Sequence, residues 1–205
     1  MCIRDRNEAI YPCGHNVVFY NIEDGTQRYI QGIEGTEGIT ALALSKSKKW
    51  LAVAEKHDKS PVCTVYNTQT LKKYKILVSL EIDKQKEYIS MAFCPKNEKL
   101  LVCLTNEPQQ QVIVWQVDRT KCVGSQPLAH PTGNVIGTQV SFKNTDQDAI
   151  LITGNNTYKY YDVKSDGNLK CTFSQLSKKE NNHLSSNYTA HCWLPDGNKF
   201  LVATD

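Results

Sequence analysis

A glycine-rich stretch, GIEGTEG, is the part of the chain most similar to a phosphate-binding loop, with glycines at Gly32, Gly35 and Gly38. Such a loop holds phosphate only when its last glycine opens a helix whose amide groups face the anion. Here a strand-like run begins at Ile39, and two glutamates inside the stretch would repel a phosphate. We therefore predict a linker and no phosphate-binding cofactor.

Other residue types that carry chemistry are present but not arranged for it. The eight cysteines contain no C-x-x-C pair, and most of them lie inside apolar runs, where a thiol behaves as a small buried hydrophobe. The sequence has no G-x-S-x-G or H-E-x-x-H motif and no paired carboxylates at a repeated position. We predict no catalytic, metal-binding or cofactor-binding residue, no small-molecule substrate, and a protein that is not an enzyme.

His191 departs from its surroundings, because the corresponding residues of the repeats described below are Leu42, Met91 and Val140. A histidine in an apolar column is compatible with a ligand or catalytic role. We favour a structural histidine that hydrogen-bonds to a neighbouring backbone or side-chain group.

Two basic runs, KSKK at 46–49 and KKYK at 72–75, could form an RNA surface, with Tyr74 offering a ring on which a base stacks. The first run is expected to be a turn and the second an outer edge strand, where lysines discourage pairing with other chains. We therefore interpret both as solvated surface.

Composition gives little support to nucleic-acid or membrane partners. The 24 basic and 21 acidic residues leave a net charge of only +3, too balanced to indicate nucleic acid. No apolar run approaches the roughly 20 residues needed to span a bilayer, and no signal-peptide core is present. We expect a soluble protein of the cytoplasm.

One sequence pattern occurs four times. It consists of two apolar runs separated by a polar turn. The copies are ITALALSKSKKWLAVA from Ile39, ISMAFCPKNEKLLVCL from Ile89, TQVSFKNTDQDAILIT from Thr138 and TAHCWLPDGNKFLVAT from Thr189. Aligned residues recur every 46 to 51 positions, including an aromatic residue outside the pattern. The aligned columns are Leu44, Phe93, Phe142 and Trp193; Leu51, Leu101, Ile150 and Leu201; and Tyr20, Tyr66, Trp115 and Tyr161.

The repeated unit has the pattern of an antiparallel meander, because its runs are short, rich in β-branched and aromatic residues, and separated by turn-forming residues. In the second unit we expect strands at 89–94, 99–105, 111–117 and 120–125. The first strand of each unit alternates large and small residues and carries no charge on either face, so both faces must be covered. An innermost strand between neighbouring sheets meets this requirement, and the sequence predicts an all-β fold of β-propeller type.

The third strand of these units ends in an aromatic residue followed by a polar one, as YN at 66–67, WQ at 115–116 and YD at 161–162. These endings resemble the Trp-Asp ending of WD40 repeats. The Gly-His half of that signature is missing, so we expect divergent WD40-like blades.

Longer stretches carry a narrower resemblance. AIYPCGHNVVFYNIEDG from Ala9, LALSKSKKWLAVAE from Leu42 and EYISMAFCPKNEKLLVCL from Glu87 resemble the N-terminal propeller of the cilia- and flagella-associated protein 57 family, also called WD-repeat-containing protein 65. The resemblance runs through nearly the whole chain after residue 8. It implies a cytoskeletal protein of the motile cilium and flagellum axoneme. The implied partners are proteins of axonemal complexes such as the inner dynein arms and the nexin–dynein regulatory complex, and the implied role supports ciliary motility.

The strands do not account for a closed ring. AIYPCG from Ala9 matches AILITG from Ala149, so the chain is expected to begin in the second strand of a blade. It is expected to end in the second strand of another blade, with LVAT from Leu201.

MCIRDR at 1–6 matches no repeat, and we predict a non-native leader. We expect an incomplete propeller that would self-associate when expressed alone, because blades bury their faces only against neighbours. The predicted units are full four-stranded blades near 39–80, 89–126 and 135–175, with partial blades at 8–31 and 188–205.

Recognition is expected in the loops between the second and third strands of successive blades, which lie on one face of the ring. We predict a non-catalytic protein-interaction scaffold. The alternatives are a general intracellular WD40 scaffold in a trafficking or RNA-associated complex outside cilia, and a propeller enzyme. The enzyme would need polar residues recurring on the innermost strands, which are instead apolar except at His191. The candidate interaction residues are Lys56, His57, Asp58, Lys59, Glu107, Gln109, Gln110, Asn155 and Asn156.

Overall fold

The computed structural model describes residues 2–5, 7–78, 86–106, 109–128, 136–145, 149–155, 157–164, 168–173 and 187–205. Within these ranges the chain forms strands, one short 3-10 helix, η1 (Val117–Arg119), and no α-helix. Within each sheet, every strand pairs antiparallel with its neighbour in sequence, as expected for a meander. The all-β prediction is confirmed.

Four four-stranded sheets and a hairpin follow one another along the described residues, and we name the sheets blades 1 to 4. Blade 1 contains β1 (Cys2–Asp5), β2 (Glu8–Cys13), β3 (Asn16–Asn21) and β4 (Gln27–Gln31). Blade 2 contains β5 (Gly38–Leu44), β6 (Trp50–Lys56), β7 (Val62–Asn67) and β8 (Lys73–Leu77). Blade 3 contains β9 (Tyr88–Phe93), β10 (Leu100–Thr105), β11 (Gln111–Gln116) and β12 (Lys121–Pro127). Blade 4 contains β13 (Ile136–Phe142), β14 (Ala149–Asn155), β15 (Thr157–Val163) and β16 (Leu169–Phe173), and the hairpin contains β17 (Tyr188–Trp193) and β18 (Phe200–Thr204).

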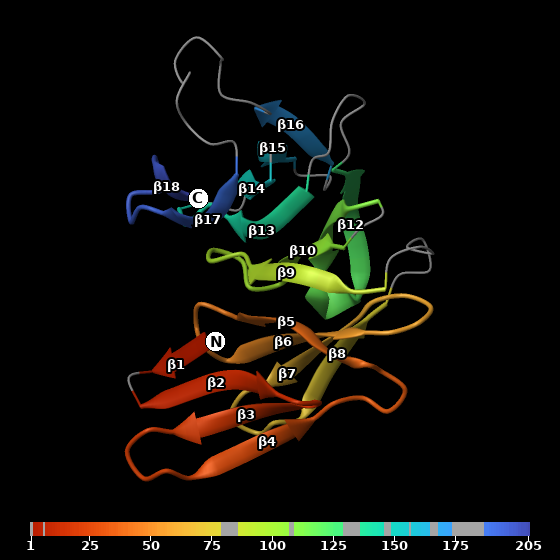
Figure 1. Cartoon of the computed structure of the whole chain (residues 1–205), viewed down its shortest axis with the longest axis vertical. Helices are drawn as coiled ribbons and strands as arrows, with labels where there is room; N and C mark the ends of the chain where they lie inside the picture. Colours follow the sequence, from red (N-terminus) through yellow and green to blue (C-terminus); the bar gives the residue numbers. More distant parts are fainter. Residues whose placement is uncertain are drawn as a thin grey trace.

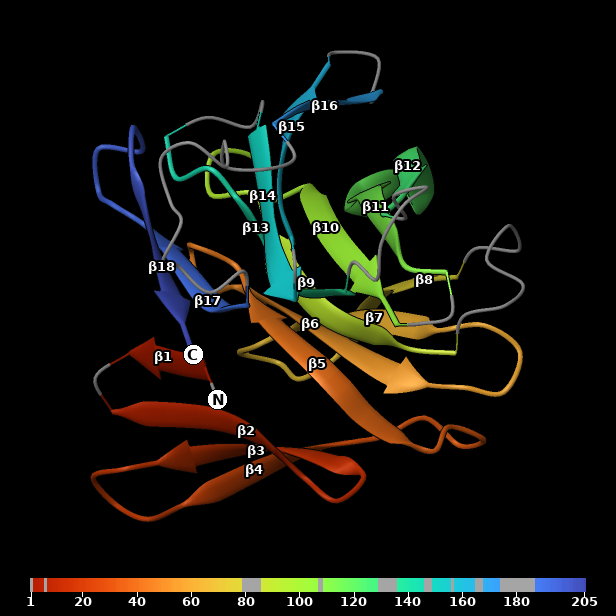
Figure 2. The ribbon, with the colours of Figure 1, turned by 45° about the horizontal axis from the view of Figure 1, so that its top comes forward.

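The blades are arranged as a sector of a β-propeller. Figure 1 shows them following one another in chain order, from the red blade 1 at the bottom to the blue hairpin, and Figure 2 shows the same succession from another side. The first strands β5, β9 and β13 contact one another in turn. They are the innermost strands, as their two apolar faces predicted, and the four strands expected in the second unit are confirmed to within two residues.

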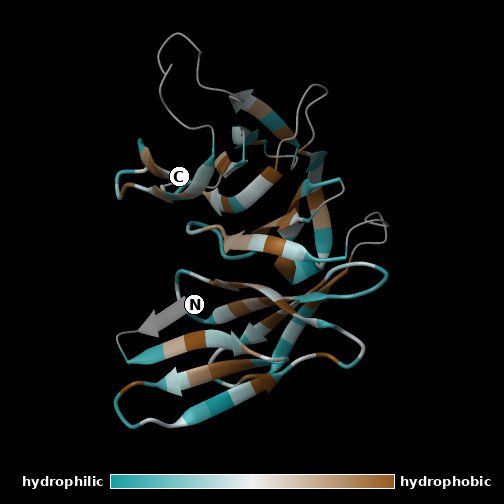
Figure 3. Ribbon diagram, viewed as in Figure 1, coloured by the Kyte–Doolittle hydropathy of each residue, from teal (hydrophilic) through white to brown (hydrophobic). Residues whose placement is uncertain are grey.

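Apolar clusters fill each junction between blades. Leu51 and Val53 of blade 2 pack against Ile10, Val17 and other residues of blade 1. A second cluster joins blades 2 and 3, and a third joins blades 3 and 4. Figure 3 shows the hydrophobic residues gathered on the strands, with hydrophilic residues at the turns. Each large side chain fully buried in this way contributes about 1.5–3 kcal/mol.

Three aromatic residues of the third-strand column belong to these clusters, whereas Tyr20 of blade 1 is only half-buried. Tyr66, Trp115 and Tyr161 are each almost completely buried. Burial raises the pKa of Tyr66 to about 12 and raises the pKa of Tyr161. The column that resembles the WD40 signature therefore serves the core, and its phenol groups stay neutral at physiological pH.

The expected match between AIYPCG and AILITG is wrong by one residue. Ala9 lies opposite Tyr20, whereas the residue opposite Tyr161 is Ile150 and not the alanine before it. A shift of one residue moves every side chain of a strand to its other face. Ile10 accordingly packs toward blade 2, and the repeated sequence pattern conceals this because both residues at the position are apolar.

The structure also contains a strand that the sequence did not predict. Cys2–Asp5 forms β1, with Ile3 opposite Ala9 of β2, so blade 1 has four strands where a partial blade was expected. A ladder is held by backbone groups and needs no particular side chain, which explains why no repeat column revealed it. The non-native origin of residues 1–6 stays a prediction.

Two glutamines tie consecutive blades together through their side-chain amides. Gln110, after β10, donates from Nε2 to the carbonyl of Gly137 at 2.9 Å and accepts from the amide of Gly137 at 2.7 Å. Gln139 makes the same two-way contact with the backbone of His191, at 3.0 and 2.8 Å. Each amide imitates one rung of a β-ladder between blades. Gln110 is only 5% exposed, so its bonds are shielded from water.

Replacing Gln110 by glutamate preserves the shape of the side chain but removes both donor hydrogens. We expect the free energy of unfolding to fall by about 2–3 kcal/mol, because a buried carbonyl loses its donor and faces a charge. Urea unfolding followed by tryptophan fluorescence measures the change. Gln109→Glu, at the exposed neighbouring position, is the matched control and should change stability by no more than about 0.5 kcal/mol. Equal losses of stability for the two variants would contradict a stabilising role for the hydrogen bonds between Gln110 and Gly137.

Candidate interaction surfaces

The loops between second and third strands lie at one edge of the propeller, because every blade has the same strand order. In blade 2 this loop is braced by ion pairs. Lys56 Nζ lies 2.5 Å from a carboxylate oxygen of Glu37, and this hydrogen bond and charge raise the pKa of Lys56. Asp58 lies 3.6 Å from the ammonium of Lys86. The loop thus presents both charge signs.

Further candidate residues of these loops make local contacts. The backbone amide of His57 donates to the carbonyl of Lys86 at 3.0 Å, and the His57 ring accepts from the amide of Lys59 at 3.1 Å. Lys59 itself is exposed. Asn155 is exposed at the end of β14 and forms an isolated bridge with Asn187. Exposed side chains are therefore present on this edge, but they are scattered.

The loop of blade 3 contributes less free surface than the sequence indicates. Gln109 is exposed, whereas Gln110 is buried and both ends of its amide are occupied by Gly137. We therefore leave Gln110 out of any partner surface. Glu107 and Asn156 lie outside the described residues.

The glycine-rich segment between β4 and β5 is a linker, as predicted, and no helix follows it. One backbone amide and one hydroxyl group of this segment bind a carboxylate of the chain itself. Glu55 is fully buried, and its Oε1 accepts from the amide of Ile33 at 2.8 Å and from the hydroxyl of Thr36 at 2.9 Å. His15 Nε2 lies 3.3 Å from the same oxygen. These contacts join blades 1 and 2.

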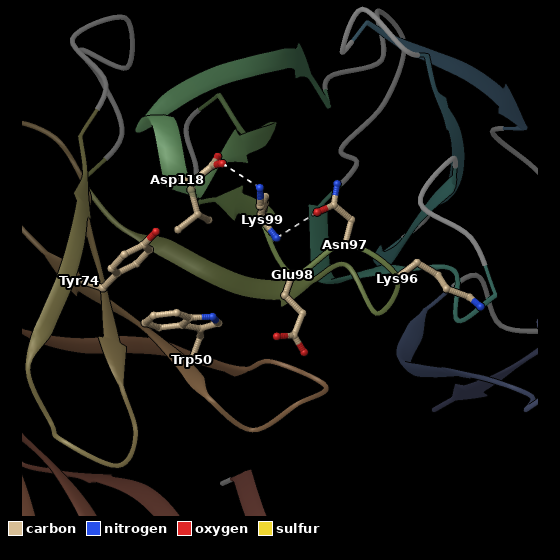
Figure 4. Close-up of a pocket in the computed structure, with 8 residues that line it drawn as sticks. Trp50, Tyr74, Lys96, Asn97, Glu98, Lys99 and Asp118 are labelled. Atoms are coloured by element: carbon tan, nitrogen blue, oxygen red, sulfur yellow. Dashed lines mark hydrogen bonds and ion pairs between the residues drawn. The ribbon is translucent and has the colours of Figure 1, made fainter.

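The opposite edge of the propeller carries a hollow of about 350 Å³ between blades 2 and 3. Trp50 and Tyr74 form one wall, with ring centroids 4.4 Å apart and planes inclined by 28°. Lys99 and Asp118, 3.4 Å apart, stand across from them, and Val117 also lines the hollow. Figure 4 shows the two rings on one side and the charged side chains around them, with Lys96 pointing outward.

Both basic runs adjoin this hollow, since Lys49 Nζ lies 4.8 Å from the centroid of the Trp50 ring and Tyr74 of the second run lines the hollow itself. Residues 46–49 are the turn before β6, and residues 72–75 enter β8, the outermost strand of blade 2, as predicted. The contact between Tyr74 and Trp50 was not predicted from the sequence. It depends on a β-bulge, because Val65 and Tyr66 of β7 lie opposite Lys75 and Lys73, which leaves Tyr74 as the extra residue.

Comparison with solved structures confirms the fold. The chain superposes on the crystal structure of the Cps50 (Swd1) β-propeller domain of Myceliophteria thermophila with a TM-score of 0.70, over 97% of this chain and 59% of that domain. The two sequences are 15% identical. No protein-family model matches the chain.

Sequence comparison gives closer relatives. The chain is 32% identical over 203 residues, 98% of its length, to cilia- and flagella-associated protein 57 of Mus musculus. The chain is a homologue of cilia- and flagella-associated protein 57. Cilia- and flagella-associated protein 57 C of Tetrahymena thermophila is also 32% identical, over 77% of this chain. The chain spans 15% of the mouse protein and 12% of the Tetrahymena protein.

The described residues of this homologue contain no group of three His, Cys, Asp or Glu side chains placed to hold a metal ion. None of them belongs to a helix long and apolar enough to cross a bilayer.

His191 is a structural histidine, as predicted. Its Nε2 lies 2.7 Å from the hydroxyl of Ser141 and its Nδ1 lies 2.7 Å from the hydroxyl of Thr153, both in blade 4. Trp193 Nε1 donates to the same Ser141 oxygen at 2.9 Å. Burial lowers the pKa of His191 to about 4. The ring is therefore neutral at pH 7 and fastens the hairpin to blade 4.

The low pKa of His191 makes stability depend on pH. Between pH 6.5 and 4 the unfolded chain binds a proton that the folded chain does not, so the free energy of unfolding falls as the pH falls, by about 3 kcal/mol over the window. His191→Gln lacks this titration while retaining hydrogen-bonding groups. We expect the variant to be less stable at pH 7 and the difference to shrink or reverse at pH 4.5, measured by urea unfolding at both pH values. A constant difference would contradict a neutral buried ring.

Proposed function

We propose that this chain is a non-catalytic protein-interaction scaffold of the cilium or flagellum. The observation that carries the proposal is similarity to cilia- and flagella-associated protein 57 over 98% of the chain, in a chain with a propeller fold. Further relatives at lower identity are also named as cilia- and flagella-associated proteins, including protein 44 of Mus musculus and protein 52 of Homo sapiens. A propeller offers rigid loops on two edges, which suits docking of other proteins.

Two features of the site support a scaffold over an enzyme. The polar column residue His191 has both ring nitrogens engaged by hydroxyl groups of the neighbouring blade. The buried carboxylate Glu55 is likewise engaged by the segment before β5. Both groups stabilise blade junctions, which is a structural use of residue types that often serve catalysis.

The finer part of the proposal concerns the partners. We propose that the scaffold acts in the axoneme of motile cilia and contacts inner dynein arms or the nexin–dynein regulatory complex. This part rests on the family resemblance.

The location is tested by tagging the endogenous protein in a ciliated cell and fractionating isolated cilia with detergent. We expect the protein in the insoluble axonemal fraction, because a structural scaffold should resist removal of the membrane and the soluble matrix. Recovery in the cell body with trafficking or RNA-associated complexes would contradict the proposal.

The partners are tested in the same cells by chemical crosslinking of isolated axonemes and mass spectrometry. We expect crosslinks to subunits of inner dynein arms or of the nexin–dynein regulatory complex, and lower beat frequency when residues 7–205 are deleted. An axonemal protein crosslinked only to other complexes would retain the scaffold role and remove the partner assignment.

A further inference from the structure

A bulge recurs at the same place in three blades. Where the fourth strand pairs with the third, the extra residue is Tyr74 in blade 2, Val123 in blade 3 and Thr172 in blade 4, at intervals of 49 residues. A bulge leaves its extra residue out of the ladder and re-aims its side chain. In blade 2 the bulge turns Tyr74 onto Trp50, at the start of the second strand.

The strand position of Trp50 is filled by Leu100 in blade 3 and by Ala149 in blade 4, each opposite the polar residue that follows the third-strand aromatic residue. In blade 3, Leu100 and Val123 both pack into the apolar cluster between the blades. In blade 2 the same two positions hold large aromatic rings, and Tyr74 remains 43% exposed. Trp50 also packs against the cluster between blades 2 and 3, whereas Tyr74 is not part of it, so the aromatic pair is partly exposed at this junction.

The surroundings of this wall are strongly basic. Segments 45–50, 72–75, 95–99 and 117–121 meet around the hollow, and they contain ten of the 24 basic residues of the chain but only two of its 21 acidic residues. All of the ten except Lys75 are exposed. Since the whole chain carries only +3, the rest of it is net acidic, and the positive field is concentrated here.

The two acidic residues at the hollow already have partners. Glu98 accepts hydrogen bonds from the amide and the hydroxyl of Ser47, the latter at 2.6 Å. Asp118 pairs with Lys99. Among the described residues, no ion pair joins the other lysines of these segments to a carboxylate.

We propose that this hollow binds an acidic peptide segment that carries a large apolar side chain. The apolar side chain lies against Trp50, Tyr74 and Val117, and the carboxylates pair with the lysines of the rim. The volume of about 350 Å³ is at the small end of ligand pockets and suits one or two side chains. This inference rests on the proposed scaffold function and names the surface and the chemistry of one partner.

Single-stranded RNA is the competing occupant of a basic aromatic surface, and the geometry disfavours it. Bases bind such surfaces by stacking on free ring faces. Here the rings of Trp50 and Tyr74 lie against each other, and the ammonium groups of Lys49 and Lys75 lie 4.8 and 5.6 Å from their respective centroids. The ring faces are therefore covered and cannot stack on a base, whereas an apolar side chain can pack against the exposed edge of Tyr74, which is 43% exposed.

Fluorescence anisotropy tests the proposal with the whole 205-residue chain and a labelled twelve-residue peptide of glutamates with one central phenylalanine. Three comparison probes are the same peptide with alanine for phenylalanine, the same peptide with glutamine for glutamate, and oligouridylate of twelve nucleotides. We expect saturable binding of the first peptide at 0.2 M salt and at least about tenfold weaker binding of all three comparison probes. Binding of oligouridylate as tight as that of the acidic peptide, or no binding of the peptide, would overturn the proposal.

Two pairs of substitutions locate the site. Trp50→Leu with Tyr74→Val copies the residues that blade 3 uses, so the fold should tolerate it, and we expect affinity to fall about tenfold. Lys49→Gln with Lys75→Gln should lower affinity about fivefold and reduce its salt dependence. Lys56→Gln with Lys59→Gln, at the opposite edge, is the matched charge control and should stay within about twofold. Equal losses in the two lysine pairs would show general charge attraction and overturn the site.

Thermal unfolding of each variant distinguishes lost binding from lost structure. The substitution of Lys49 and Lys75 keeps the test decisive if the aromatic substitution unfolds the chain. Failure of the docking site is separate from failure of the proposed function. If the peptide does not bind but the endogenous protein remains axonemal, the site is wrong and the scaffold role stands. If the peptide binds but the protein is not ciliary, the docking chemistry stands without that role.

Discussion

Burial of each sheet against the next is the constraint on which the whole molecule depends. No blade has a core of its own, because a single sheet must bury both faces against other elements. In β10, Leu101 and Cys103 face blade 2 while Val102 and Leu104 face blade 4. A strand covered on both faces cannot show polar and apolar residues in alternation, which accounts for the continuous apolar runs of the sequence.

Polar groups complete the junctions that apolar packing begins. Gln110 and Gln139 fix one blade against the backbone of the next. The His191 ring binds hydroxyl groups at the same junction as Gln139, and Glu55 binds an amide and a hydroxyl group at the junction of blades 1 and 2. Apolar packing alone tolerates sliding, since it has no direction, whereas a two-way amide contact has one geometry. Buried polar groups in this protein therefore set the relative position of the blades.

The fold was largely predictable because equivalent positions of its repeated unit hold similar types of residue. Apolar runs and aromatic columns recur at intervals of 46 to 51 residues, and the strand order follows from them. The register of β2 was not predictable, because Ala9 and Ile10 are both apolar and a one-residue shift leaves the pattern intact. The strand β1 was not predictable either, since its pairing is made by the backbone.

The candidate site was predictable only in part. The two basic runs and Tyr74 were visible in the sequence, but their meeting depends on tertiary contacts between segments about 25 residues apart. Gln110 was predicted from its polarity to be an exposed loop residue, but it is buried and binds the backbone of the next blade. Polarity alone does not distinguish a residue offered to a partner from one used inside the fold.

The recurring bulge gives this architecture an evolutionary property. Because its extra residue is outside the hydrogen-bonded ladder, the amino acid at that position can change without altering strand pairing. The three copies hold a tyrosine, a valine and a threonine within one backbone geometry. A duplicated blade can therefore acquire a new surface by substitution at one position, while its strands keep the same pairing.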